Sequence, residues 1–383
     1  MNHPSNIPAD APLVIGVMAG SSRDGLDVAA CRFWQASTGE QRWQWRIERA
    51  TTLPYTPGWD NHLQRLPEAS AAELAKAHTD YGHLLGMELR RWCVQESLSP
   101  ALVSVHGHTV FHRPQTEHFT WQLGSGEVIA SHLPAPVVTD LRTKDVALGG
   151  EGAPLVPFAE RHLFPRTQAF LNLGGIANLS LRGDLFDPAD FPSPGCWLRK
   201  PPAVLAFDLA PCNQLLNRLA AAHDPALRHD PEGELARSGE RLPALEASLL
   251  ELPYHHLPAP KSLGNEDVWA DFWPRIEAAE GRPVDKLRSR VEVLAVLHRQ
   301  ALEQLSARPA SILLTGGGAY NRYLVERLAE AVRPLGVELD IPAAELIDNK
   351  EALAWAFLGL LRWRGEVNHL PAATGSRRAT VLG

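Results

Sequence analysis

The sequence predicts an α/β fold in two related halves. Short apolar segments alternate with amphipathic ones, as strands alternate with helices in such folds. Two apolar segments also run through a glycine-rich turn into a second strand, at residues 13–33 and 170–181. The second hairpin echoes the first and is the nearest approach to an internal repeat, so each half is expected to contain one.

Length and composition fit a two-domain protein. With 383 residues, 45% hydrophobic and 21% charged, the chain can bury a substantial core and is not disordered. A net charge of −7 argues against general binding of nucleic acid or of an anionic membrane, although backbone N–H groups can still hold phosphates locally. The cysteines are widely spaced, which argues against a disulfide framework and favours a reducing compartment.

The cellular location is predicted from two absences. Residues 1–11 lack the basic and apolar regions of a signal peptide, and no apolar run reaches the ~18 residues of a membrane-spanning helix. We therefore expect a cytoplasmic protein with neither nucleic acid nor membrane as a partner. A homodimer is compatible with the sequence.

Capping signals and periodicity predict the helices. A capping box, Ser70-x-x-Glu73, indicates a helix start. Residues 286–305 show a strongly amphipathic pattern, and residues 351–363 are apolar nearly all round, which indicates a buried helix. Further expected elements are strands at 102–105 and 311–315, a helix at 213–222, and a proline-rich surface excursion at 182–203.

The first glycine turn, GSSRDG (residues 20–25), is suited to anions. Small residues let backbone N–H groups approach a phosphate, and Ser21 and Ser22 add hydroxyl donors. Asp24 could orient a magnesium ion through its waters. An ordinary polar β-turn is the alternative, and the lysine of a P-loop is absent.

Two more glycine turns follow at strand ends. NLGGIAN (residues 172–178) lies between strands, and TGGGAYN (residues 315–321) lies between a strand and a helix, where an adenosine or phosphate can meet the helix N-terminus. Each turn alone is also a common tight turn. Together, the three predict two phosphate-binding hairpins and an adenosine site facing one cleft.

Charged residues in two stretches are candidates for chemistry. Asp208, in AFD, is expected at a strand's end, as a general base or as a partner of the following helix dipole. Arg142 lies between Asp140 and Asp145, and could bind a substrate carboxylate or pair structurally with an aspartate. HGHTVFH lacks clear metal-binding spacing, so His106 is better explained by a hydrogen bond to a sugar hydroxyl.

These motifs, in this order, resemble those of the anhydro-N-acetylmuramic acid kinase family over residues 14–374. The family's M-S-G-T-S-x-D-G-x-D corresponds to MAGSSRDGLD, its S-H-G-Q-T-x-x-H-x-P to VHGHTVFHRP, and its D-F-R-x-x-D-x-A-x-G-G-Q-G-A-P-L-V-P to DLRTKDVALGGEGAPLVP. NLGGIAN, KSLGNE, GGGAYN and EALAWAF match further family patterns. Such a series in fixed order is highly specific.

The resemblance implies a two-lobed actin/hexokinase-like (ribonuclease H-like) fold with ATP in the cleft between the lobes. The first lobe would span residues 1–143, joined by residues 351–383, and the second residues 144–350. The implied activity requires ATP and Mg²⁺ and acts on 1,6-anhydro-N-acetylmuramic acid. Water activated by an aspartate, by position Asp208, opens the anhydro ring, and the freed 6-oxygen takes the γ-phosphate. The product, N-acetylmuramic acid 6-phosphate, belongs to peptidoglycan recycling.

The resemblance also implies binding roles for individual residues. Asp24 would serve the magnesium ion. The sugar would be bound by His106, Asp140, Arg142 and Glu351. ATP would be bound by Gly20, Ser21, Ser22, Arg23, Asp24, Gly25, Leu26, Asp27, Gly174, Gly175, Asn178, Gly316, Gly317 and Gly318.

The chain departs from the family pattern next to the expected base. The usual F-D-T-G-P-G-N is FDLAPCN here, so Leu209 removes a hydroxyl and Cys212 replaces a glycine, which bears on the sugar pocket or the phosphate path. Glu151 stands for the usual glutamine. The alternatives are a non-catalytic sugar sensor on the same fold and a kinase of a different anhydro-sugar. Retention of Asp24, Asp208 and the glycine turns favours the enzyme.

Overall fold

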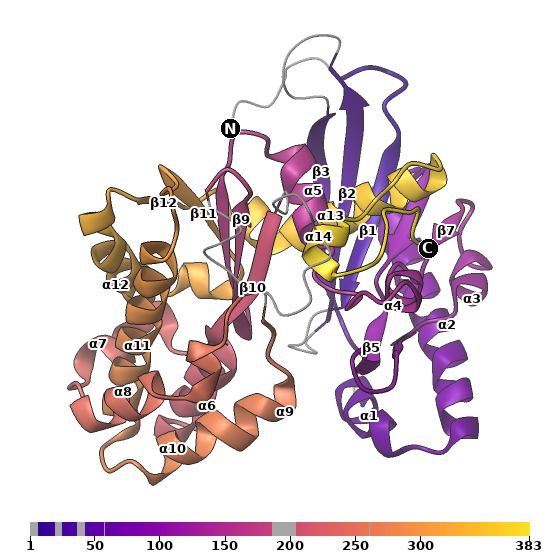
Figure 1. Cartoon of the computed structure of the whole chain (residues 1–383). Helices are drawn as coiled ribbons and strands as arrows, with labels where there is room; N and C mark the ends of the chain where they lie inside the picture. The colour runs from indigo at the N-terminus through magenta and orange to yellow at the C-terminus, as the bar shows by residue number, and fades with distance from the viewer. Residues whose placement is uncertain (1–6, 20–24, 37–42, 57, 186–203, 260) are drawn as a thin grey trace. The chain divides into compact units, whose positions relative to one another are not determined.

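The chain forms two compact units (Figure 1). The computed structural model describes residues 7–19, 25–36, 43–56, 58–185, 204–259 and 261–383. Unit 1 consists of Met1–Pro165 and Asn349–Gly383, and unit 2 of Arg166–Asp348. The expected lobes were 1–143 with 351–383, and 144–350, whereas residues 144–165 and 349–350 belong to unit 1. Helix α5 (Val156–Leu163) is tied to the N-terminal part of that unit, because the indole N–H of Trp45 donates to the carbonyl of Leu163 at 3.1 Å.

Both units contain a five-stranded sheet of the same topology. The strand order is β3-β2-β1-β4-β7 in unit 1 and β10-β9-β8-β11-β12 in unit 2. In each sheet the first three strands pair antiparallel and the last three pair parallel. This arrangement is the ribonuclease H-like fold, and its repetition confirms the two related α/β halves that the sequence predicts.

The predicted strand segments are present, and β3, β5, β6, β7 and β12 are additions to them. The strands of unit 1 are β1 (Leu13–Ala19), β2 (Gly25–Gln35), β3 (Trp43–Pro54), β4 (Leu102–Val105) and β7 (Val137–Val138), with a separate hairpin of β5 (His108–Arg113) and β6 (Phe119–Leu123). The strands of unit 2 are β8 (Ala169–Leu173), β9 (Ile176–Arg182), β10 (Val204–Pro211), β11 (Ser311–Thr315) and β12 (Glu338–Asp340). The predicted excursion at 182–203 falls mostly outside the described residues.

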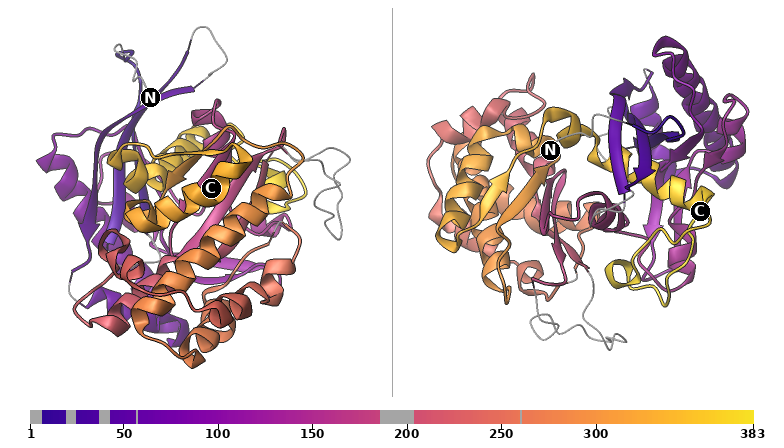
Figure 2. Two further views of the ribbon diagram at one scale, coloured as in Figure 1. Left: turned by 90° about the vertical axis from the view of Figure 1, so that its left-hand side faces the viewer. Right: turned by 90° about the horizontal axis from the view of Figure 1, so that it is seen from above.

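The predicted helices are present (Figures 1 and 2). In unit 2 the amphipathic segment forms α11 (Pro283–Glu303), which packs against α6 (Asn213–His223), α7 (Glu234–Ser238) and α12 (Arg322–Val332). The capping box of Ser70 and Glu73 starts α2 (Ala71–Gln95) in unit 1. Among the described residues, no helix is both long and apolar enough to span a membrane.

Glycines let α13 (Ala344–Trp363) approach the sheet of unit 1 closely. A Cβ on Gly16 of β1 would lie 2.6 Å from the backbone nitrogen of Ala356, and one on Gly359 would collide with the side chain of Ser104 in β4. Residues 352–361 of this helix are all buried, as its apolar pattern predicts. The helix carries Glu351, so this packing also positions a predicted site residue.

We predict that Gly16→Ala lowers the free energy of unfolding by about 2 kcal/mol or more, because the new methyl group meets backbone atoms that cannot rotate away. Urea denaturation followed by tryptophan fluorescence measures this. A change within ~0.5 kcal/mol, as is usual for a surface substitution, would contradict the close approach.

Candidate functional site

The two glycine turns of unit 2 lie against each other. Gly316 has a φ of +82°, and a Cβ there would lie 2.8 Å from the carbonyl carbon of Leu173. A Cβ on Gly318 would lie 2.6 Å from Leu173 Cβ, so glycine is required at both positions. Gly317 between them is exposed, and Asn213 Nδ2, at 3.8 Å, is the nearest atom that a Cβ there would meet. The predicted adenosine turn and the second hairpin therefore share one surface.

Backbone N–H groups at the helix starts beside this surface already donate hydrogen bonds within the protein. The backbone N–H groups of Cys212 and Asn213, where α6 begins, donate to the carbonyls of Gly175 and Gly174 at 2.8 and 3.1 Å. The start of α12 is capped by the side chain of Asn321. Helix N-termini bind anions through such N–H groups. Phosphate contacts are therefore expected from the glycine turns rather than from these helix starts.

The first hairpin is described from Gly25 onward. Residues 20–24, with Gly20, Ser21, Ser22, Arg23 and Asp24, lie outside the described part of the chain. Leu26 is buried in the core, so its side chain does not face a ligand. The partly exposed Asp27 accepts a hydrogen bond of 2.7 Å from the hydroxyl of Thr52, which lies opposite it on β3.

The metal prediction depends on the same hairpin. Among the described residues, no group of three or more His, Cys, Asp or Glu side chains could hold a metal ion. Magnesium bound with a nucleotide needs only one or two carboxylates beside the phosphates. Asp27 is a partly exposed carboxylate of this hairpin, and Asp24 lies outside the described residues.

Asp208 lies within β10, and the expectation that it ends the strand is wrong. The strand continues to Pro211, and α6 begins only after Cys212, so Asp208 does not interact with the helix start. Asp208 pairs with Asn178 of β9, and the register shifts between Asp208 and Ala210. This β-bulge leaves one extra residue and re-aims the chain. Bulges commonly lie next to active sites.

Four groups hold Asp208 in place. Its backbone N–H donates to Lys261 O at 2.9 Å, and its carbonyl accepts from the Tyr254 hydroxyl at 2.6 Å. On the carboxylate, Oδ2 accepts from the N–H of Leu263 at 2.8 Å, and Oδ1 accepts from the side-chain amide of Asn178. Burial raises the pKa of Asp208 to about 6, although both hydrogen bonds oppose this. The KSLGNE match hinted at this loop, but the sequence did not assign it to Asp208.

The two departures beside Asp208 lie in the core of unit 2. Leu209, the extra residue of the bulge, is 5% exposed, and Cys212 is fully buried. Burial raises the pKa of the Cys212 thiol to about 12, so it stays protonated at neutral pH. Both substitutions therefore alter packing beneath the site, and the Cys212 thiol donates to Asn213 Oδ1 at 3.7 Å.

In unit 1, three predicted sugar residues gather around Trp355. The ring of His106 meets the Trp355 ring edge-on, with centroids 4.8 Å apart. The guanidinium carbon of Arg142 lies 5.9 Å from the same ring's centroid. Glu351 lies one helical turn before Trp355 on α13 and attracts Arg142 electrostatically. The sequence did not single out this tryptophan.

Burial sets the charges of this cluster. It lowers the pKa of Arg142 to about 10, so the guanidinium remains charged at neutral pH. It lowers the pKa of His106 well below the usual value, helped by Arg142, so the ring is neutral. Among the described residues, Nε of Arg142 and Nε1 of Trp355 are buried without a hydrogen-bond partner. Such groups are rarely left unpaired, and a polar ligand could pair them.

Asp140 does not join the cluster. It is exposed, has a φ of +57°, and accepts a 3.3 Å hydrogen bond from Thr143 N at the start of α4 (Thr143–Ala147). Asp145 is fully buried and accepts from Gly152 N at 2.8 Å and the Thr374 hydroxyl at 2.7 Å. Both aspartates therefore have hydrogen-bond partners other than Arg142.

Glu151, the departure in the GGEGAPL segment, is partly buried, which raises its pKa. Its Oε1 accepts from Gln115 Nε2 at 3.4 Å. The carboxylate is therefore engaged with a neighbouring side chain.

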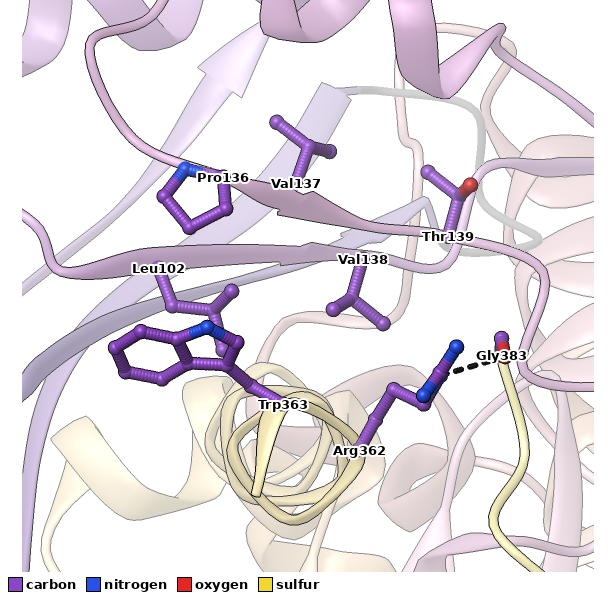
Figure 3. A pocket seen from close by; sticks show the side chains of 8 residues that line it. All are labelled: Leu102, Pro136, Val137, Val138, Thr139, Arg362, Trp363 and Gly383. Atoms are coloured by element: carbon purple, nitrogen blue, oxygen red, sulfur yellow. Dashed lines mark hydrogen bonds between the residues drawn. The ribbon is translucent and has the colours of Figure 1, made fainter. Parts of the chain in front are cut away.

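A hollow of about 340 Å³ lies elsewhere in unit 1, between α13 and the strands β4 and β7 (Figure 3). Its charged lining side chain, Arg362, donates to the carbonyl of Gly383 at 2.6 Å. The other side chains that line it come from Leu102, Pro136, Val137, Val138, Thr139 and Trp363, and none of the predicted site residues is among them.

Two ribonuclease H-like units, one with a partly buried carboxylate beside paired glycine turns, define the actin/hexokinase-like class. The sequence model of the anhydro-N-acetylmuramic acid kinase family matches residues 12–383. Proteins of that name from Actinobacillus pleuropneumoniae serotype 5b and Vibrio vulnificus are 30% and 32% identical to this chain. The alignments cover 97% of this chain in both cases, and 98% and 97% of those proteins. The chain belongs to the anhydro-N-acetylmuramic acid kinase family.

A solved structure of a sugar kinase matches the chain at low sequence identity. The ROK hexokinase from Thermus thermophilus is 15% identical, with a TM-score of 0.35, covering 91% of this chain and 99% of that chain.

We predict that the Asp208 carboxyl titrates near pH 6, about two units above a free aspartate, because burial disfavours its charged form. Carbon-13 NMR of aspartate-labelled protein measures this, and Asp208→Asn identifies the signal by its loss. A titration at or below pH ~4, the range of an unperturbed aspartate, would contradict the burial argument.

Proposed function

We propose that this protein is an ATP-dependent kinase of 1,6-anhydro-N-acetylmuramic acid that opens the anhydro ring with water and phosphorylates the 6-oxygen. The observation that carries the proposal is Asp208, a carboxylate held on both oxygens with a pKa near 6. The names of the relatives supply the substrate. The product would be N-acetylmuramic acid 6-phosphate, and the role peptidoglycan recycling in the cytoplasm, where ATP is available.

Asp208 would act as the general base. A base works best when its pKa lies near the operating pH, because it is then largely deprotonated and still accepts a proton readily. Its carboxylate would take a proton from water as the water oxygen bonds to the anomeric carbon. The bond from that carbon to O6 breaks on the opposite face, and O6 bonds to the γ-phosphorus as ADP leaves. A non-catalytic sugar sensor would not need such a base.

The glycine turns would receive the nucleotide. Gly317 is exposed, and its neighbours Gly316 and Gly318 hold the turn against the hairpin of Gly174 and Gly175. Backbone N–H groups of such turns can approach phosphate oxygens closely. In the first hairpin, Asp24 would hold Mg²⁺ through water molecules. Bound Mg²⁺ would neutralise phosphate charge.

The Trp355 cluster would bind the sugar. Arg142 is a buried cation whose Nε has no hydrogen-bond partner among the described residues, so the lactyl carboxylate of a muramic acid would accept a hydrogen bond from it and add to the attraction of Glu351. Neutral His106 and the carboxyl of Glu351 are suited to hydroxyl or amide groups. Among amino sugars, the carboxylate distinguishes muramic acid from glucosamine, so Arg142 would set this preference.

We predict that Asp208→Asn lowers turnover by at least ~100-fold while sugar and ATP still bind, because asparagine keeps the shape and loses the proton acceptor. Product formation from the anhydro-sugar and ATP, followed by mass spectrometry in oxygen-18 water, measures this. In wild type the label should enter the anomeric hydroxyl. The control is Asp224→Asn at the exposed end of α6. Label in the phosphate, or an active Asp208→Asn, would overturn the assignment.

We predict that Arg142→Ala raises the KM for the anhydro-sugar at least ~10-fold, the loss expected when a charge-assisted hydrogen bond is removed, and leaves the KM for ATP unchanged. Steady-state kinetics with each substrate varied in turn measures this, with Arg90→Ala on the exposed face of α2 as the control. An increase in the KM for ATP alone would place Arg142 at the nucleotide.

A further inference from the structure

Four polar residues form a row across the sheet of unit 2. In the strand register, Thr315 of β11 pairs with Asn172 of β8, Asn172 with Asn178 of β9, and Asn178 with Asp208 of β10. Residues in register across neighbouring strands present their side chains on the same face of a sheet. Leu173 and Leu179, each next to an asparagine of the row, are buried in the core of the unit.

The side chains of this row are hydrogen-bonded in one direction. The Thr315 hydroxyl donates to Asn172 Oδ1 at 3.3 Å, and Asn172 Nδ2 donates to Asn178 Oδ1 at 3.5 Å. Asn178 Nδ2 then donates to Asp208 Oδ1. Each amide thus accepts on its oxygen and donates from its nitrogen. The row ends on the carboxyl group of Asp208, which in its charged form can only accept hydrogen bonds.

We propose that Asn178, supported by Asn172, is a positioning residue for Asp208 rather than a ligand of ATP. The inference rests on the proposed function, in which Asp208 is the base. The two asparagines keep one carboxylate oxygen turned along the sheet, and the N–H of Leu263 fixes the other, so the carboxylate plane cannot rotate. A fixed plane presents the same unshared electron pairs to the attacking water in every turnover.

The row also explains one of the glycines. A Cβ on Gly316 would lie 2.8 Å from Asn172 Oδ1, so a side chain there would displace the amide that supports Asn178. Gly316 therefore serves the row as well as the turn. Gly317, which touches none of these groups, remains available to a nucleotide.

Loss of the Asn178 amide should raise the pKa of Asp208. Asn178 stabilises the charged form of Asp208, while burial destabilises it. Removing the amide leaves the burial, so Asn178→Ala should raise the pKa of Asp208 by about one unit or more, as expected for a hydrogen bond to a charged group. The base then needs a higher pH to be deprotonated, so the acidic limb of the pH profile moves upward.

The experiment compares wild type with the variants Asn178→Ala and Asn172→Ala. The control is Asn217→Ala, which changes an exposed residue of α6. Carbon-13 NMR follows the Asp208 carboxyl, and kinetics gives the acidic limb of kcat/KM and the KM for ATP. We expect Asn178→Ala to raise both the pKa of the Asp208 carboxyl and the pH of the acidic limb of kcat/KM. Asn172→Ala should raise both by a smaller amount, and the KM for ATP should stay unchanged in each variant. Asn172→Ala, one step further from the carboxylate, provides the test if Asn178→Ala does not fold.

An Asp208 pKa that is the same as in wild type in both variants would overturn the inference. A raised KM for ATP with no change in the Asp208 pKa would overturn it as well. The NMR titration needs no turnover. If wild type fails to phosphorylate the anhydro-sugar, the proposed function falls, and the NMR result alone decides whether Asn178 supports Asp208.

Discussion

The pairing of β9 with β10 is the constraint on which the site of unit 2 depends. Side chains alternate between the faces of a sheet, so a slip of one residue would bury Asp208 and turn Leu209 outward. Asp208 stays opposite Asn178 while Leu209 joins the core, and the bulge after Asp208 lets Ala210 pair with Ala177 and be buried as well. The contacts from Lys261 and Leu263 then fix the strand at the residue that carries the chemistry.

The duplicated fold uses an equivalent position differently in each unit. Asp27 is the third residue of β2, and Asn178 is the third residue of β9. Each is hydrogen-bonded to the residue opposite it on the next strand, Thr52 in unit 1 and Asp208 in unit 2. The carboxylate of unit 1 therefore lies on β2, the middle one of three antiparallel strands. The carboxylate of unit 2 lies on β10, the outer one of the three. One architecture thus presents two carboxylates whose surroundings suit different tasks.

Burial tunes the charged groups of both units in opposite directions. It raises the pKa of Asp208 into the range of a general base and lowers that of Arg142, which still stays charged at neutral pH. Asp208 is held by the neutral amide of Asn178, whereas Arg142 lies beside the Trp355 ring and is attracted electrostatically by Glu351. Desolvated charges of this kind interact strongly with a ligand of suitable charge or hydrogen-bonding capacity, because little solvent must be displaced.

Local patterns in the sequence determined the α/β class, the paired hairpins, the main helices and the motif order that places the chain in its family. Each of these depends on neighbours within a few turns or strands, which periodicity and capping reveal. Only the tertiary structure decided that Asp208 lies inside a bulged strand, that Asn178 faces it, and that Trp355 gathers His106 and Arg142. These relations join residues far apart in the chain. Strand register and helix packing create them, and both depend on burial summed over a whole unit rather than on any local segment.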